Sequence, residues 1–92
     1  MQVKIRFFAR FRELYGAEII REISGDMTVR DLIRTVAGKE REGYTALFEE
    51  SGEIREFVVL MKNGKRIENK DAGVLEVTDR DEIAVFPPVA GG

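Results

Sequence analysis

Near its start, over residues 3–8, the chain alternates between apolar and charged side chains with the two-residue period of a β-strand. A strand over residues 3–8 has one wholly apolar face, whereas its other face carries two cations and the aromatic Phe8. A short helical turn is expected over 10–15 and a second strand over 18–23. The pattern therefore predicts a hairpin with a long connection between its arms.

The strongest helical pattern begins at Thr28. Thr28 and Asp31 form a start that resembles a capping box, with the acid well placed for the helix dipole. Apolar residues then recur at helical spacing in a single stripe, which we expect to end at Gly38 or Gly43. A second, short helix is expected over 45–50.

The second half of the chain predicts three more strands. A continuous apolar run over 57–61 is typical of a strand that is apolar on both faces. Asn63 and Gly64 favour a type I′ turn, after which 65–67 would form a short return strand. The final strand is expected over 82–86. Since one amphipathic helix can cover only one sheet face, the element order predicts an α+β fold, a mixed sheet with one main helix packed across one face, which is the β-grasp arrangement.

The second face of such a sheet is left without a helix. Alternation places Phe8, Ala84 and Phe86 on that face, close to the C-terminal end of the final strand. A contiguous exposed apolar patch is typical of a binding surface. The alternative is that Phe8 folds over a strand edge or packs under the 10–15 turn. Arg66 and the two cations of the first strand could add a basic rim that suits an acidic partner, although scattered cations are usually only solvated.

The end of the chain differs in character from the rest, so residues 1–86 are expected to form the domain and 87–92 an extended tail. Two prolines hold the tail extended, and glycines pass through slots too narrow for other residues. The terminal carboxylate is then a chemical handle, whereas the alternative is a frayed terminus. The residues of the tail are Pro87, Pro88, Val89, Ala90, Gly91 and Gly92.

Composition restricts the chemistry. The 92 residues, 43% of them hydrophobic, suit one small domain, and the absence of Cys and His excludes thiol nucleophiles, imidazole bases and the usual zinc ligands. We expect no metal site: the paired acids Asp79 and Asp81 could suggest one, but they are expected to form a charged turn. Positive and negative residues are interspersed and the net charge is −2, so the chain has no basic patch typical of nucleic-acid binding.

The chain has no apolar stretch near the ~20 residues of a membrane span and no signal peptide. We therefore expect a cytoplasmic protein that does not bind membranes. No Walker lysine motif and no dinucleotide fingerprint is present, so no cofactor is expected on this chain.

Two stretches resemble the MoaD/ThiS family of ubiquitin-like sulfur carriers. Residues 7–16 are similar to the FFA-x-x-REL-x-G opening of that family, and residues 81–92 to its DE-[VIL]-A-x-FPPV-x-GG ending. The double proline resembles the MoaD branch, the molybdopterin synthase small subunits. The segment 38–56 is more similar to archaeal members, some of which are small archaeal modifier proteins.

This resemblance implies a non-catalytic carrier. A MoeB-type, E1-like enzyme would use ATP to adenylate Gly92, and a persulfide would then convert it to a thiocarboxylate. A MoaE-like large subunit would receive Gly91 and Gly92 and pass the sulfur on in molybdenum or tungsten cofactor biosynthesis. The alternative is a ubiquitin-like modifier joined through Gly92 to lysines of target proteins. Arg66 stands where some bacterial members carry leucine. The residues expected to contact partners are Phe8, Ala84, Phe86, Pro87, Pro88, Val89, Ala90 and Arg66.

Overall fold

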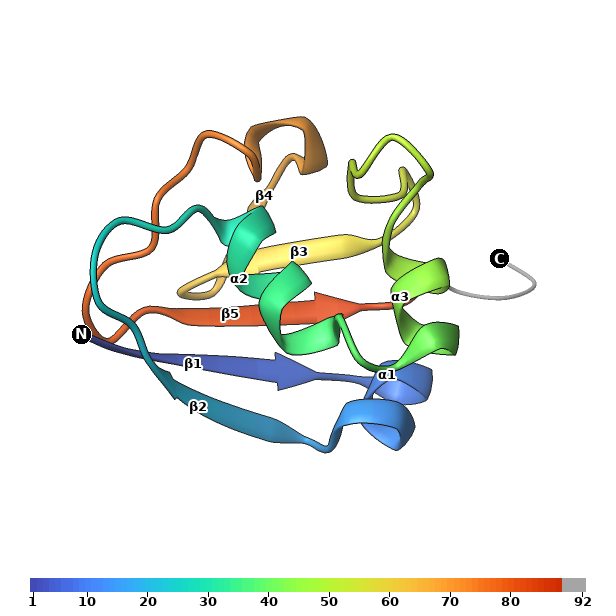
Figure 1. Ribbon diagram of the computed structural model, residues 1–92, viewed down its shortest axis with the longest axis horizontal. Helices are drawn as coiled ribbons and strands as arrows, with labels where there is room; N and C mark the ends of the chain where they lie inside the picture. Colours follow the sequence, from blue (N-terminus) through green and yellow to red (C-terminus); the bar gives the residue numbers. More distant parts are fainter. Residues whose placement is uncertain (89–92) are drawn as a thin grey trace.

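A computed structural model describes residues 1–88 of the chain. Figure 1 shows its elements. In chain order they are β1 (Gln2–Phe7), α1 (Ala9–Tyr15), β2 (Glu18–Glu22), α2 (Val29–Ala37), α3 (Arg41–Leu47), β3 (Val59–Lys62), β4 (Lys65–Ile67), the 3-10 helix η1 (Asn69–Asp71) and β5 (Glu82–Phe86).

The strands form one mixed sheet in the order β2-β1-β5-β3-β4. The first and last strands are parallel neighbours, with Ile5 opposite Ile83, and the other three pairs are antiparallel. The last strand therefore lies at the centre of the sheet, next to the first, as their apolar patterns predict. The architecture confirms the expected α+β, β-grasp (ubiquitin-like) fold.

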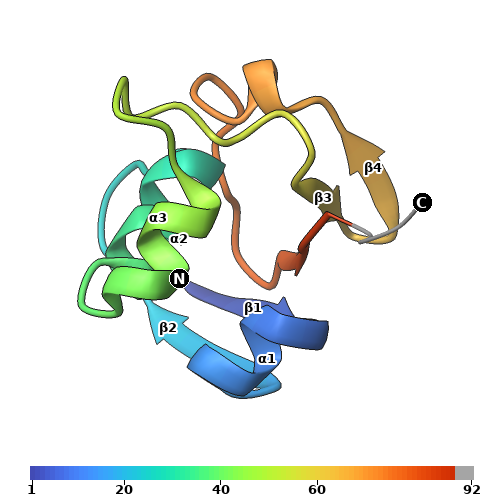
Figure 2. The same cartoon turned by 90° about the vertical axis from the view of Figure 1, so that its right-hand side faces the viewer.

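The core lies between the sheet and α2. Figure 2 shows α2 and α3 on one side of the curved sheet. Apolar residues of the sheet face that meets these helices lose nearly all their solvent contact, which is the main stabilising contribution in a domain of this size. The core residues with at most 1% exposure include Val3, Ile5, Phe7, Leu32, Ile33, Leu60, Ile83 and Val85.

The helices confirm one expectation and correct another. The Thr28 hydroxyl accepts a hydrogen bond from the Asp31 amide at 3.1 Å, and α2 ends at Gly38, as predicted. The second helix was expected over 45–50 but runs over Arg41–Leu47. Gly43 lies inside this helix, where the Tyr15 ring from α1 occupies the space that a Cβ at position 43 would need.

The apolar run over 57–61 was expected to be strand throughout, and this is wrong for its first two residues. The Val58 amide donates to the Arg55 carbonyl at 3.1 Å, so residues 55–58 form a turn and β3 begins at Val59. The β3–β4 hairpin is confirmed, since Asn63 and Gly64 have φ of 52° and 82°, the positive values that a type I′ turn requires.

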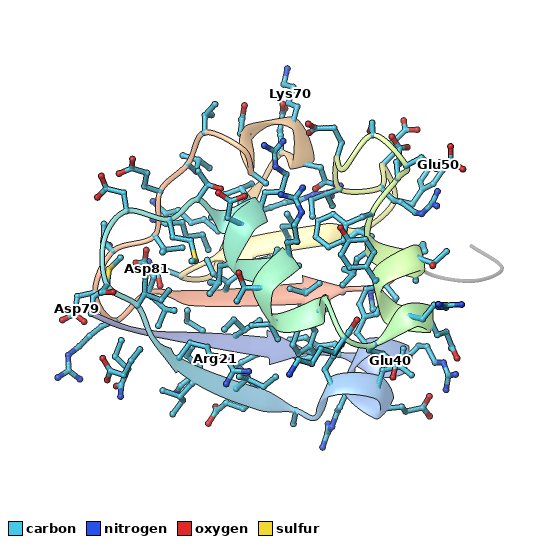
Figure 3. All side chains as sticks on the ribbon, in the orientation of Figure 1. Arg21, Glu40, Glu50, Lys70, Asp79 and Asp81 are labelled. Carbon is cyan, nitrogen blue, oxygen red and sulfur yellow. The ribbon has the colours of Figure 1, made fainter. Side chains whose placement is uncertain are left out.

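The charged turn predicted over 79–81 is confirmed, since the Asp81 amide donates to the Thr78 carbonyl at 3.1 Å, but Asp81 itself is only 5% exposed. Its carboxylate accepts hydrogen bonds from the Thr78 amide at 2.7 Å and the Asn63 side chain at 2.8 Å. Burial alone would raise the pKa of Asp81, but these hydrogen bonds, together with the charge of Lys62 at 3.5 Å, lower that pKa below its usual value. Figure 3 shows Asp81 at the end of the sheet where β5 begins. The carboxylate thus ties the hairpin turn to the start of the central strand.

Candidate functional site: the open sheet face

The face of the sheet opposite the core carries the predicted partner-binding residues. Cross-strand register aligns Arg6, Ala84, Met61 and Arg66 in one row across four strands. Ala84 and Phe86 are half-buried, whereas Ile83 and Val85, which alternate with them on β5, are buried in the core. We call this surface the open face, defined by Phe8, Val59, Met61, Arg66, Ala84 and Phe86.

Two aromatic side chains form the centre of the open face. Phe8 follows β1 as the N-cap residue of α1, and its amide donates to the Val85 carbonyl at 3.2 Å. Its ring is stacked on Phe86, with centroids 4.2 Å apart and planes 12° from parallel. Phe8 is therefore half-buried against the last residue of β5, and it does not fold away over a strand edge. The stack joins the end of β1 to the point where the chain leaves the sheet.

The predicted basic rim is largely neutralised within the protein. Lys4 lies 3.5 Å from Glu18, and Arg6 lies 3.3 Å from Glu82, with its guanidinium carbon 5.2 Å from the centroid of the Phe8 ring. Such exposed pairs stabilise the fold only slightly, but they reduce the charge that a partner would meet. Arg66 is exposed and makes no ion pair with any carboxylate of residues 1–88. Of these three cations, Arg66 is therefore the one that no carboxylate within residues 1–88 neutralises.

The first two residues of the tail, Pro87 and Pro88, come directly after Phe86 of the aromatic stack. Pro87 is half-buried and Pro88 is exposed, and neither can donate a backbone hydrogen bond. The predicted roles of four further residues lie outside the described part of the chain and remain predictions: Val89, Ala90, Gly91 and Gly92.

The side chains of the open face are mainly aromatic and aliphatic. Within residues 1–88 no group of three or more acidic, His or Cys side chains is placed to hold a metal ion. No helix in this part of the chain is long and apolar enough to cross a membrane. The open face carries an aromatic pair, flanking aliphatic side chains and Arg66, which pairs with no carboxylate within residues 1–88, and Pro87 and Pro88 follow this face in the chain. A contiguous apolar surface is typical of a binding site.

Sequence reasoning missed two residues near this site. Phe57 was assigned to a strand but is 71% exposed in the turn before β3. Asn69 donates its side-chain amide to three carbonyls of residues 55–58. An isolated Asn in a loop gives no signal of such a role, whereas the exposure of Phe57 was hidden by the apolar run that contains it.

These features define a class, the small ubiquitin-like carriers, in which a β-grasp domain carries a C-terminal glycine pair. A family model for the ThiS family matches residues 5–92, and the chain belongs to this family. The chain is 38% identical to small archaeal modifier protein 3 of Haloferax volcanii over 93 residues, which span all of both proteins. It is also 29% identical over 92 residues to the molybdopterin synthase sulfur carrier subunit of Arabidopsis thaliana, covering all of this chain and 84% of that protein.

Solved structures agree with the fold. The crystal structure of SAMP1 from Haloferax volcanii superposes with a TM-score of 0.83 at 27% identity and covers all of both chains. A chain in the crystal structure of the Amycolatopsis orientalis BexX/CysO complex superposes with a TM-score of 0.72 at 26% identity, covering 98% of this chain and 99% of that one. Relatives of this chain thus include a protein named as a modifier, a protein named as a sulfur carrier and a chain solved in a complex.

Proposed function

We propose that this protein is a carrier whose Gly92 carboxylate is activated by an E1-like enzyme at the expense of ATP. The observation that supports this proposal best is the Phe8–Phe86 stack, an apolar contact at the point where the chain leaves β5 and the tail begins. A partner bound to the open face would have the tail within its reach. Membership of the ThiS family, whose model extends through the last residue, supports the same conclusion.

Activation solves a chemical problem, because a carboxylate is a poor electrophile. Its oxygen attacks the α-phosphorus of ATP, pyrophosphate leaves, and the Gly92 carbonyl becomes a mixed anhydride with AMP as its leaving group. The enzyme supplies the nucleotide site and the catalytic side chains. This chain contributes the docking surface and the reacting carboxylate, so it acts as a substrate and a subunit.

The first fate of the activated carbonyl is sulfur transfer. A persulfide of the activating system attacks the carbonyl and releases AMP, and a thiol then reduces the resulting acyl disulfide to leave a Gly92 thiocarboxylate. As the small subunit of molybdopterin synthase, the protein would dock on a MoaE-like large subunit and donate this sulfur to the pterin precursor. The similarity to the Arabidopsis sulfur carrier and the FPPV-x-GG ending support this fate.

The second fate is conjugation. A lysine amine of a target protein attacks the activated carbonyl, AMP leaves, and an isopeptide bond joins Gly92 to the target. The 38% identity to small archaeal modifier protein 3 favours this fate, and the activation step is the same.

The two fates give different masses in the protein isolated from its own cells. Sulfur transfer predicts a free protein whose mass is raised by the exchange of one oxygen for sulfur. Conjugation predicts a ladder of larger species that survive reduction and boiling, with Gly92 linked to lysine in tryptic peptides. A protein that carries neither modification during growth on molybdate or tungstate would contradict the proposal.

A further inference from the structure

Phe57 is a large apolar side chain that the fold holds out in solvent. It is 71% exposed, although the next residue, Val58, is 1% exposed and belongs to the core. Single exposed apolar residues are common and carry no meaning by themselves. The argument for Phe57 comes from how firmly its turn is held and from where the turn lies.

The turn over 55–58 is hydrogen-bonded to two other elements, η1 and α3. The Asn69 side-chain amide, from η1, donates to the carbonyls of Arg55 at 2.8 Å, Glu56 at 3.3 Å and Val58 at 2.7 Å. The Arg55 amide donates to the Leu47 carbonyl of α3 at 2.8 Å, and its guanidinium Nε donates to a second α3 carbonyl at 2.6 Å. A backbone held at both ends in this way presents the Phe57 ring from a fixed position, which lowers the entropy lost when the ring is bound.

The position of the turn connects it with the open face. β3 begins two residues after Phe57, and its first residue, Val59, lies opposite Phe86 in the register. Phe57 therefore lies near the end of the sheet where β5 finishes and Pro87 begins. Figure 1 shows the loop before β3 and the end of β5 at the same, right-hand side of the molecule. A partner that covers the Phe8–Phe86 stack and receives the tail would meet this turn.

We propose that Phe57 is an anchor residue that inserts into an apolar pocket of the E1-like activating enzyme, beside the slot that receives the tail. This inference rests on the proposed function and adds a contact to the same partner surface. An aromatic ring can bury ~150–250 Å² and a few such anchors dominate many interfaces. The exposed, charged Arg55 and Glu56 flank the ring, so the pocket is expected to be apolar at its base and polar at its rim. The activating enzyme is the occupant because both fates of Gly92 pass through it.

The test uses ATP–pyrophosphate exchange catalysed by the E1-like enzyme encoded in the same genome, measured against carrier concentration. Phe57→Ala is expected to raise KM for the carrier by about tenfold or more, with its thermal unfolding unchanged because the ring is exposed. Val74→Ala is the matched control, since Val74 is 75% exposed but belongs to the segment between η1 and β5. An unchanged KM for Phe57→Ala, or an equal rise for Val74→Ala, would overturn the inference. Failure of the proposed function looks different, because the wild-type protein itself would then support no exchange.

A second pair of variants tests whether Asn69 acts through Phe57 as a positioning residue. Asn69→Ala keeps the ring but releases the turn, so a rise in KM of about threefold is expected, smaller than that of Phe57→Ala. In the double variant Phe57→Ala/Asn69→Ala, removal of Asn69 is expected to add nothing to KM, because no ring is left to position. Additive effects of the two substitutions would contradict this coupling.

Discussion

Phe86→Ala separates a binding role from a structural role at the open face. The ring of Phe86 is half-buried and stacked on Phe8. Truncation of a fully buried Phe costs about 3–5 kcal/mol, so a ring with one face in solvent should cost about 2 kcal/mol of unfolding free energy. Domains of this size have ~5–15 kcal/mol of stability, and the variant should therefore remain folded.

The same substitution should have a larger consequence for binding, because it removes the centre of the patch. A central aromatic contributes 2 kcal/mol or more in many interfaces, which corresponds to a loss of affinity of about 30-fold or more. Urea unfolding and calorimetric titration with the E1-like enzyme measure the two quantities on the same samples. Ile23→Ala is the control, since Ile23 is 8% exposed on the core side and its truncation should cost about 2 kcal/mol without altering affinity. Wild-type affinity in Phe86→Ala, or an equal loss in the control, would refute the assignment of Phe86 to the partner surface.

Three further predictions concern the fold. Gly43→Ala should lower the free energy of unfolding by about 1–3 kcal/mol in urea, because the new Cβ displaces the Tyr15 ring from its packing on Phe7; an unchanged value would mean that the ring moves freely. Asp81→Asn should lower it by about 1–3 kcal/mol at neutral pH. Because folding lowers the pKa of Asp81 from 3.8, the carboxylate contributes its full stabilisation above pH 3.8 and loses it as the pH falls further. The unfolding free energy of the variant should therefore fall less steeply with decreasing pH than that of the wild type. Equal pH dependence in the two proteins would mean that other carboxylates cause the loss of stability in acid. Burial, and then the charge of Glu40, raises the pKa of Tyr15 to about 12, so phenolate absorbance should show a late-titrating tyrosine that Tyr15→Phe removes. The neutral phenol of Tyr15 contributes its full stabilisation to the fold below pH 10.0, and this is lost as the pH rises toward 12. A tyrosine that titrates at the ordinary pKa would contradict the burial of Tyr15.

Periodicity identified most of the fold because the core itself imposes it. The alternation in β1 and β5 follows from burial of one strand face, and the register pairs Ile5 with Ile83 in the centre of that face. The stripe of α2 likewise follows from one helix covering one side of the sheet. Signals of this kind lie within a few residues of each other, so a single sequence contains them in full.

The errors fall where distant residues decide the local structure. Asn69 holds the turn that removes Phe57 from β3, and Asn63, which is 18 residues from Asp81, donates a hydrogen bond to the buried Asp81 carboxylate. Both partners are distant in the sequence, so no local pattern predicts these contacts. Gly43 in α3 is a further case, because the Tyr15 ring from α1 fills the space that a Cβ at this position would need.

The open face shows the same division. Alternation placed Ala84 and Phe86 together, and the register of the strands agrees. Alternation did not predict that Phe8 follows β1 and stacks on Phe86, or that Arg6 pairs with Glu82 whereas Arg66 pairs with no carboxylate within residues 1–88. The identities of the surface residues could be predicted, whereas their pairings depend on side-chain geometry across strands.

Isotope exchange between pyrophosphate and ATP tests the central claim most directly, with the E1-like enzyme and either the full chain or a chain lacking Gly92. We expect rapid exchange with the full chain and none with the shortened one, while both give the same thermal unfolding curve. Exchange that persists without Gly92 would show that the terminal glycine is not the group that ATP activates, and the account of this protein as a carrier would be wrong.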